Sequence, residues 1–83
     1  MRIRLHPHAL DRLADRGATE AEVTAAIELG EQFPAKQGRV GFRRNFAYNG
    51  IWRGHAYATK QLEVYAVEES GEWLVITVIV KYF

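Results

Sequence analysis

The sequence predicts an α+β fold in which a short strand and two helices precede an antiparallel sheet. Helical periodicity is confined to residues 7–30, whereas extended patterns separated by turn dipeptides begin at Gly38 and continue to the C-terminus. The chain has 83 residues and no Pro-, Gly- or Ser-rich linker, so we expect a single domain over residues 1–83. Because the helices and strands are segregated along the chain, we expect a short N-terminal strand, two helices and a three- or four-stranded antiparallel sheet.

The first two elements are a strand and an amphipathic helix. Residues 2–5 alternate charged and apolar side chains, which is typical of a short strand with one solvated face. Pro7 suits the first turn of a helix, where an N–H would have no partner. The helix is expected to end at Gly17. Its apolar side comprises Ala9, Leu10, Leu13 and Ala14.

The second helix begins with a capping box. Thr19 is followed three residues later by Glu22, so each side chain can accept a hydrogen bond from the other residue's backbone N–H. Val23, Ala26 and Ile27 recur at helical spacing and form its expected inner stripe, and Gly30 or Pro34 ends the helix.

The second half of the chain predicts strands and tight turns. Asn49-Gly50 is a strong two-residue hairpin signal, and Ser70-Gly71 marks a second turn. Residues 73–80 are apolar on both faces, so we expect the last strand to be central in the sheet.

Composition and charge distribution limit the possible partners. The absence of cysteine excludes disulfides, thiolate metal sites and a cysteine nucleophile. No apolar run is long enough to cross a bilayer, and we expect a cytoplasmic protein with no membrane partner. The net charge is +1, but residues 36–60 carry six basic side chains and no acid. Such a segment attracts polyanions.

His8, Arg12 and Arg16 are spaced four residues apart along the first helix. Residues at this spacing stack one turn apart, so they form a ridge. An imidazole can transfer a proton near neutral pH, and a guanidinium fork matches phosphate oxygens. The pattern indicates a phosphate site with catalytic potential. The alternative is a solvated helix face on which the arginines pair with Asp11 and Asp15.

The basic segment is a candidate nucleic-acid-binding surface, because cations follow a phosphate backbone and aromatic rings stack on unpaired bases. Its candidate contacts are Arg39, Arg43, Arg44, Trp52, Arg53, His55 and Lys60. Alternatively, its aromatic residues belong to the core of the sheet and its cations form an edge, or the segment binds an acidic protein.

The C-terminal end supplies weaker candidates. Thr77 and Lys81 share one side of the last strand, and Tyr82 lies on the other. A lysine there can stabilise charge on a phosphate, although one so close to the terminus is more often only solvated. No cofactor or metal site is expected, because the histidines lack cysteine and carboxylate neighbours and no glycine-rich phosphate loop precedes a helix.

Residues 8–20, with His-Ala, Arg four residues after the histidine and Arg-Gly four further on, resemble the opening of a family of small bacterial and phage-associated domains of uncharacterised function. The strand Leu74–Val78 is similar to that family's closing strand. The family is distantly similar to RelE-type and BrnT-type toxins, which share a strand-helix-helix-sheet layout and cleave RNA without a metal ion.

This resemblance implies a metal-independent, RelE-like endoribonuclease toxin of a toxin–antitoxin system. It implies RNA, on or off the ribosome, as substrate, and an acidic antitoxin as partner, with the chain a monomer or homodimer. The catalytic positions it indicates are His8, Arg12 and Arg16, with Lys81 and Tyr82 as further candidates. Arg43 or Arg44 would assist in stabilising charge. The alternative is a non-catalytic RNA-binding or protein-interaction domain.

Overall fold

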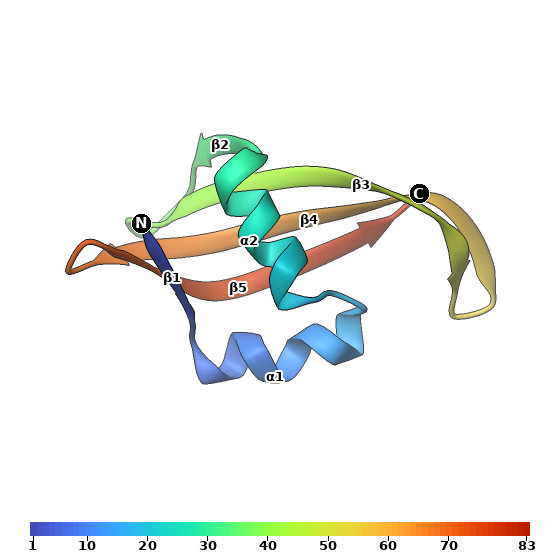
Figure 1. Ribbon diagram of the computed structural model, residues 1–83, viewed down its shortest axis with the longest axis horizontal. Helices are drawn as coiled ribbons and strands as arrows, with labels where there is room; N and C mark the ends of the chain where they lie inside the picture. The colour runs from blue at the N-terminus through green and yellow to red at the C-terminus, as the bar shows by residue number, and fades with distance from the viewer.

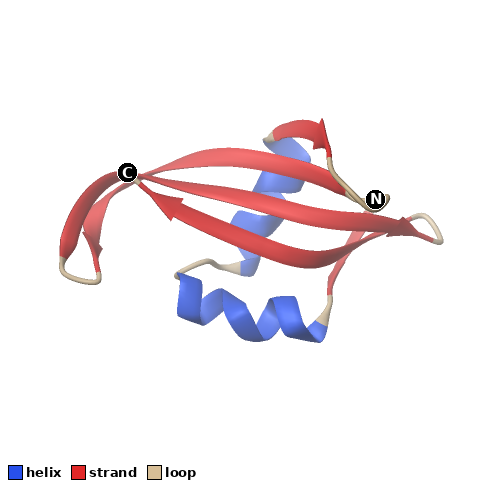
Figure 2. Ribbon diagram, turned by 180° about the vertical axis from the view of Figure 1, so that it is seen from behind, coloured by secondary structure: helices blue, strands red, loops and turns tan.

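The computed structural model describes residues 1–83 and contains a five-stranded sheet with two helices on one face (Figures 1 and 2). The predicted α+β class is confirmed. In chain order the elements are β1 (Arg2–Leu5), α1 (Pro7–Arg16), α2 (Glu20–Leu29), β2 (Glu31–Pro34), β3 (Val40–Trp52), β4 (His55–Glu69) and β5 (Glu72–Tyr82).

The sheet is mixed and has the strand order β1-β5-β4-β3-β2. β1 pairs parallel with β5, and every other pair is antiparallel. The middle strand is therefore β4, and the last strand, β5, lies between β4 and β1, so its expected central position is confirmed only for the part that β1 flanks. β5 has β1 beside it only over residues 72–75, so its remaining residues form an open edge. Beyond the part that β1 flanks, the apolar character of β5 reflects its packing against α1.

α1 begins and ends where the sequence indicates. Pro7 occupies its first turn, and Gly17, with a φ of 74°, caps its C-terminus. Ala9 and Leu13 are buried, but Leu10 is 46% exposed, contrary to the expected apolar face. The reason is that α1 lies beside the β5 edge and so buries a narrower stripe than a helix centred on a sheet.

α2 starts with the predicted capping box. The Thr19 hydroxyl accepts from the Glu22 N–H at 3.1 Å, and the Glu22 carboxylate accepts from the Thr19 N–H at 2.9 Å. The helix ends at Leu29, and β2 follows immediately, a strand that the sequence analysis did not predict. Together the two helices and the sheet enclose the core residues Ala9, Leu13, Ala18, Val23, Ala26, Phe42, Leu62, Val64, Ala66, Val75 and Val78.

One of the two expected hairpin turns is displaced. Strands β3 and β4 reverse at Arg53-Gly54, whose φ values of 51° and 85° suit a tight hairpin turn. Asn49 instead lies in a register irregularity between Ala47 and Gly50, with a φ of 47°. The predicted turn at Asn49-Gly50 is wrong because a bulge also uses the positive φ that asparagine tolerates. The turn at Ser70-Gly71 is confirmed, with φ values of 51° and 76°.

The β3–β4 hairpin extends past the helices and bends at its tip, on the right of Figure 1. It contributes to a longest dimension of 41 Å. Neither helix has the length and apolar character needed to cross a membrane.

Candidate functional site

An open groove of about 400 Å³ runs between α1 and the open edge of β5. It exists because β1 ends at Leu5, after which the chain turns into α1 and leaves β5 without a neighbouring strand on that side. The groove is lined by His8, Ala9, Asp11, Arg12, Arg16, Ile76, Thr77 and Val78. The structure thus brings the predicted helical ridge together with Thr77 of β5.

The arginines of the groove carry unneutralised charge. Neither Arg12 nor Arg16 forms an ion pair with Asp11, Asp15 or any other acid. Elsewhere in the fold, glutamates form ion pairs with Arg2, Arg4, Arg43, Lys60 and Lys81. Arg16 donates one hydrogen bond to the carbonyl oxygen of Val78, which fixes its side chain across the groove. A guanidinium has five N–H donors, so this bond leaves others for a ligand. Asp11 is the one carboxylate in the lining.

His8 is exposed and lies against a second histidine. The His6 and His8 rings stack with their centroids 5.3 Å apart and their planes 8° from parallel. His6 Nδ1 accepts a hydrogen bond from the His8 backbone N–H at 3.2 Å, so a neutral His6 carries its proton on Nε2. His6 is the N-cap of α1 and does not line the groove, so it bears on the site only through its contact with His8.

The tip of the β3–β4 hairpin contacts the C-terminal end of α1. Arg53 Nη2 donates to the Asp15 carbonyl oxygen at 3.2 Å, and the Arg53 guanidinium lies 5.2 Å from the Trp52 ring centre. A smaller hollow of about 140 Å³ lies at this junction. It is lined by Asp15, Arg16, Trp52, Arg53, Val80 and Tyr82, and therefore shares Arg16 with the groove.

Tyr82 is engaged in the fold. Its hydroxyl donates to the Arg16 carbonyl oxygen at 2.9 Å, and its ring stacks on Trp52 with centroids 4.8 Å apart. Burial raises the pKa of Tyr82, with a smaller contribution from Tyr48. Tyr82 lines the smaller hollow but not the groove that contains His8.

Lys81 and Arg43 lie on the face of the sheet that the helices do not cover. Leu62 and Val64 point into the core, so the alternation of β4 directs Glu63 to the face without helices. There Lys81 Nζ is 3.3 Å and Arg43 Nη2 is 2.8 Å from the Glu63 carboxylate. Burial by itself raises the pKa of Glu63, but the hydrogen bonds from Arg43 and Lys81 outweigh it and hold that pKa below its ordinary value.

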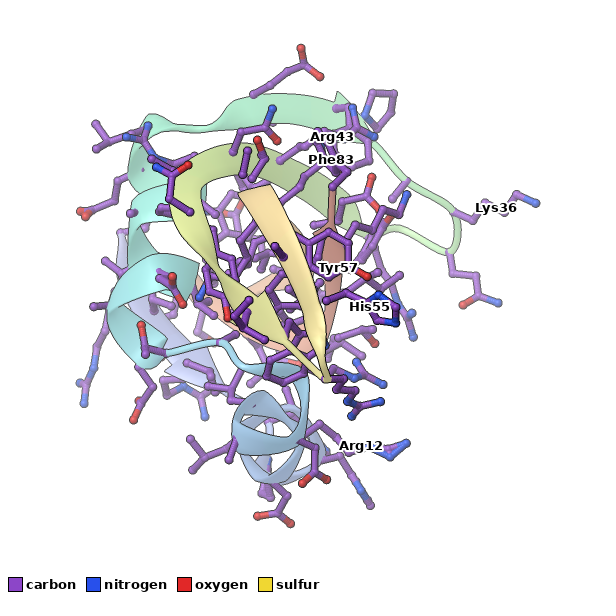
Figure 3. All side chains as sticks on the ribbon, turned by 90° about the vertical axis from the view of Figure 1, so that its right-hand side faces the viewer. Arg12, Lys36, Arg43, His55, Tyr57 and Phe83 are labelled. Atoms are coloured by element: carbon purple, nitrogen blue, oxygen red, sulfur yellow. The ribbon has the colours of Figure 1, made fainter.

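The rest of the basic segment does not form one surface. Lys60 is buried, and its ammonium group forms an ion pair with Glu22. Arg44 lies over Phe46 and reaches the Leu29 carbonyl oxygen, whereas Arg39 precedes β3 at the other end of the sheet from the hairpin tip. His55 is at the tip beside Tyr57. Figure 3 shows Arg12 below the hairpin tip, with Lys36 and Arg43 well away from Arg12.

Two further observations bear on the choice of site. A hollow of about 370 Å³ on the hairpin is lined by Asn49, Gly50, Ile51, Ala56, Tyr57 and Ala58 and contains no charged group. No cluster of three or more histidine, cysteine, aspartate or glutamate side chains is arranged to hold a metal ion. Among the hollows of the structure, the groove between α1 and β5 is the one that combines an imidazole with arginines that have no ion pair.

Comparison with protein-family models, with curated proteins and with solved structures finds no match to this chain. Its function is therefore inferred from the geometry of the groove.

Proposed function

We propose that this protein is a metal-independent ribonuclease-like domain of the toxin type, and that RNA is cleaved in the groove between α1 and β5. The observation that carries the proposal is the meeting of His8, Arg12 and Arg16 in one open groove, in which neither arginine is neutralised by a carboxylate. Single-stranded RNA supplies both the negative charge that such a groove attracts and a nucleophile within the substrate itself.

The reaction is an internal transfer at phosphorus. The ribose 2′-oxygen forms a bond to the adjacent phosphorus, and the bond from phosphorus to the 5′-oxygen breaks. His8 accepts the proton of the 2′-hydroxyl as general base. The 5′-oxygen takes its proton from water, because His8 is the one imidazole that lines the groove. The products are a 2′,3′-cyclic phosphate and a 5′-hydroxyl, and no redox partner is needed.

Charge stabilisation falls to the two arginines of the groove. Negative charge builds on the non-bridging phosphate oxygens as the 2′-oxygen attacks, and fixed cations stabilise that charge more than they stabilise the ground state. Arg16 is fixed in position by its bond to Val78, so its guanidinium needs little reordering to bind. Arg12 is one helical turn away on the same ridge.

A non-catalytic RNA-binding domain is the second candidate. It is favoured by the engagement of Lys81 and Tyr82 in contacts outside the groove, which leaves His8 as the one proton-transfer group that lines it. In either case an acidic antitoxin is a suitable partner, because its carboxylates match the free arginines of the groove.

Induced expression followed by mapping of new RNA 5′ ends tests the proposal. We expect growth arrest and new 5′-hydroxyl ends with the wild type and neither with His8→Gln or Arg12→Gln. Lys36→Gln is the matched control, since Lys36 is an exposed cation outside the groove and well away from Arg12 in Figure 3, and we expect it to behave as the wild type. If the wild type is soluble and changes neither growth nor RNA, the nuclease proposal is wrong.

A further inference from the structure

We infer that Arg53, at the tip of the β3–β4 hairpin, forms a second phosphate subsite beside the groove, so that the protein binds single-stranded RNA across several consecutive phosphates. The inference rests on the proposed function for the identity of its ligand, RNA. It adds a binding residue that lies on a different element from the His8 ridge and does not take part in the cleavage step.

The first argument is geometric. The groove of α1 and β5 and the hollow at the hairpin tip share Arg16, so the two cavities adjoin at that side chain. Arg12 and Arg16 are one helical turn apart, about 5.4 Å along the axis, a spacing of the same order as that between neighbouring phosphates on one strand. Arg53 continues the row beyond the end of α1, because its guanidinium bonds to the carbonyl oxygen of Asp15.

The second argument concerns charge. Arg12, Arg16 and Arg53 are all free of ion pairs, although they come from two elements far apart in the sequence. The other lysine and arginine residues without ion pairs are Lys36, Arg39 and Arg44, which lie near β2 or the start of β3. The free cations near α1 thus converge on the two adjoining hollows, whereas Arg43, Lys60 and Lys81 are neutralised by glutamates.

The third argument is preorganisation. Arg53 Nη2 is bonded to Asp15, and the guanidinium lies over the Trp52 ring, so the side chain is fixed before any ligand binds. One hydrogen bond leaves most of its donors for phosphate oxygens. Trp52 itself packs on Tyr82 and lies against Gly17. Trp52 therefore positions Arg53, and we assign it no base-stacking role.

This arrangement predicts recognition of the RNA backbone with little preference among bases. Affinity should rise with oligonucleotide length until the strand reaches Arg53 as well as the groove. It should also fall steeply with salt, because each neutralised phosphate releases counterions. For a single strand, the slope of log K against log salt changes by about 0.7 for each phosphate contact that is lost.

Fluorescence anisotropy with labelled 2′-O-methyl oligonucleotides measures binding without cleavage. Oligonucleotides of two, four and eight nucleotides are titrated at several salt concentrations against the wild type, Arg53→Gln and Arg39→Gln. We expect Arg53→Gln to weaken binding of the eight-nucleotide strand and to reduce the salt slope by about 0.7, with little effect on the dinucleotide. Arg39→Gln should match the wild type, because Arg39 lies at the opposite end of β3 from Arg53 and lines neither hollow.

Arg53→Lys is the second variant, because it keeps the charge and should keep most of the salt slope. Circular dichroism checks that each variant is folded. Equal effects of Arg53→Gln and Arg39→Gln would overturn the inference. So would a loss of binding in Arg16→Gln without one in Arg53→Gln, and that result would still support the groove as the RNA site. No binding by the wild type would overturn both proposals. Binding that depends on Arg53, in a protein that cleaves no RNA, would support the subsite and reject the nuclease.

Discussion

Lys60 Nζ lies 2.7 Å from Glu22 Oε2, and the two side chains are only 10% and 20% exposed. Lys60 also donates to the Gly17 carbonyl oxygen at 2.8 Å, while Glu22 closes the capping box of α2. One side chain of the sheet thus connects both helices to β4. A cation from the segment that the sequence marks as a polyanion-binding surface is in this way part of the structural framework.

We expect Glu22→Gln to lower the free energy of unfolding by about 3 kcal/mol, because it leaves the Lys60 ammonium group buried without a counter-charge. Glu20→Gln on the exposed side of the same helix is the control, and should change stability by less than about 0.5 kcal/mol. Urea unfolding followed by circular dichroism measures both. Equal effects of the two substitutions would mean that the buried pair is not important for stability.

His8→Gln should reduce the cleavage rate about 100-fold or more if His8 transfers the proton of the 2′-hydroxyl. RNA affinity should change little, because the arginines of the groove remain. Single-turnover cleavage of a labelled RNA, in the presence of EDTA, separates the chemical step from binding and tests metal independence as well. A His8→Gln protein that binds RNA as the wild type does and cleaves at the wild-type rate would remove His8 from the mechanism.

Glu63 should make stability depend on acid pH. Its pKa is lowered in the folded protein, so its ion pairs with Arg43 and Lys81 contribute stability above the ordinary carboxyl pKa of about 4.3. That contribution is lost as pH falls through the lower folded pKa. We expect Glu63→Gln to lower the free energy of unfolding by about 2 kcal/mol at neutral pH. The difference in unfolding free energy between the variant and the wild type should be smaller near pH 2 to 3. Urea unfolding across this pH range measures the difference, and a constant difference would contradict the assignment.

Tyr82→Phe should lower the free energy of unfolding by about 1 kcal/mol, because the ring stack on Trp52 stays and the hydrogen bond to the Arg16 carbonyl oxygen is lost. The raised pKa of Tyr82 means that its phenol contributes stability below about pH 10, and that this is lost as pH rises through the higher folded value. RNA cleavage by the variant should equal that of the wild type. A large loss of cleavage without a loss of stability would instead give the Tyr82 hydroxyl a catalytic role.

Local signals predicted the parts of the fold that depend on residues close in sequence. The capping box of Thr19 and Glu22, the Gly17 helix end and the Ser70-Gly71 turn each involve groups only a few residues apart, and each is present. The choice between Asn49-Gly50 and Arg53-Gly54 as the hairpin turn was not predictable in this way. Both dipeptides accept a positive φ, and the register between β3 and β4 selects one of them.

The sequence by itself determined the α+β class and the His8, Arg12 and Arg16 ridge, because helical periodicity and the position of a side chain on its helix are local properties. Only the tertiary structure decided which cations are free. Arg43 is neutralised by Glu63 across two strands and Lys60 by Glu22 between sheet and helix, whereas Arg53 meets the end of α1 without a carboxylate partner. Charge neutralisation depends on which distant side chains the fold brings within a few ångströms, and spacing along the chain carries no such information.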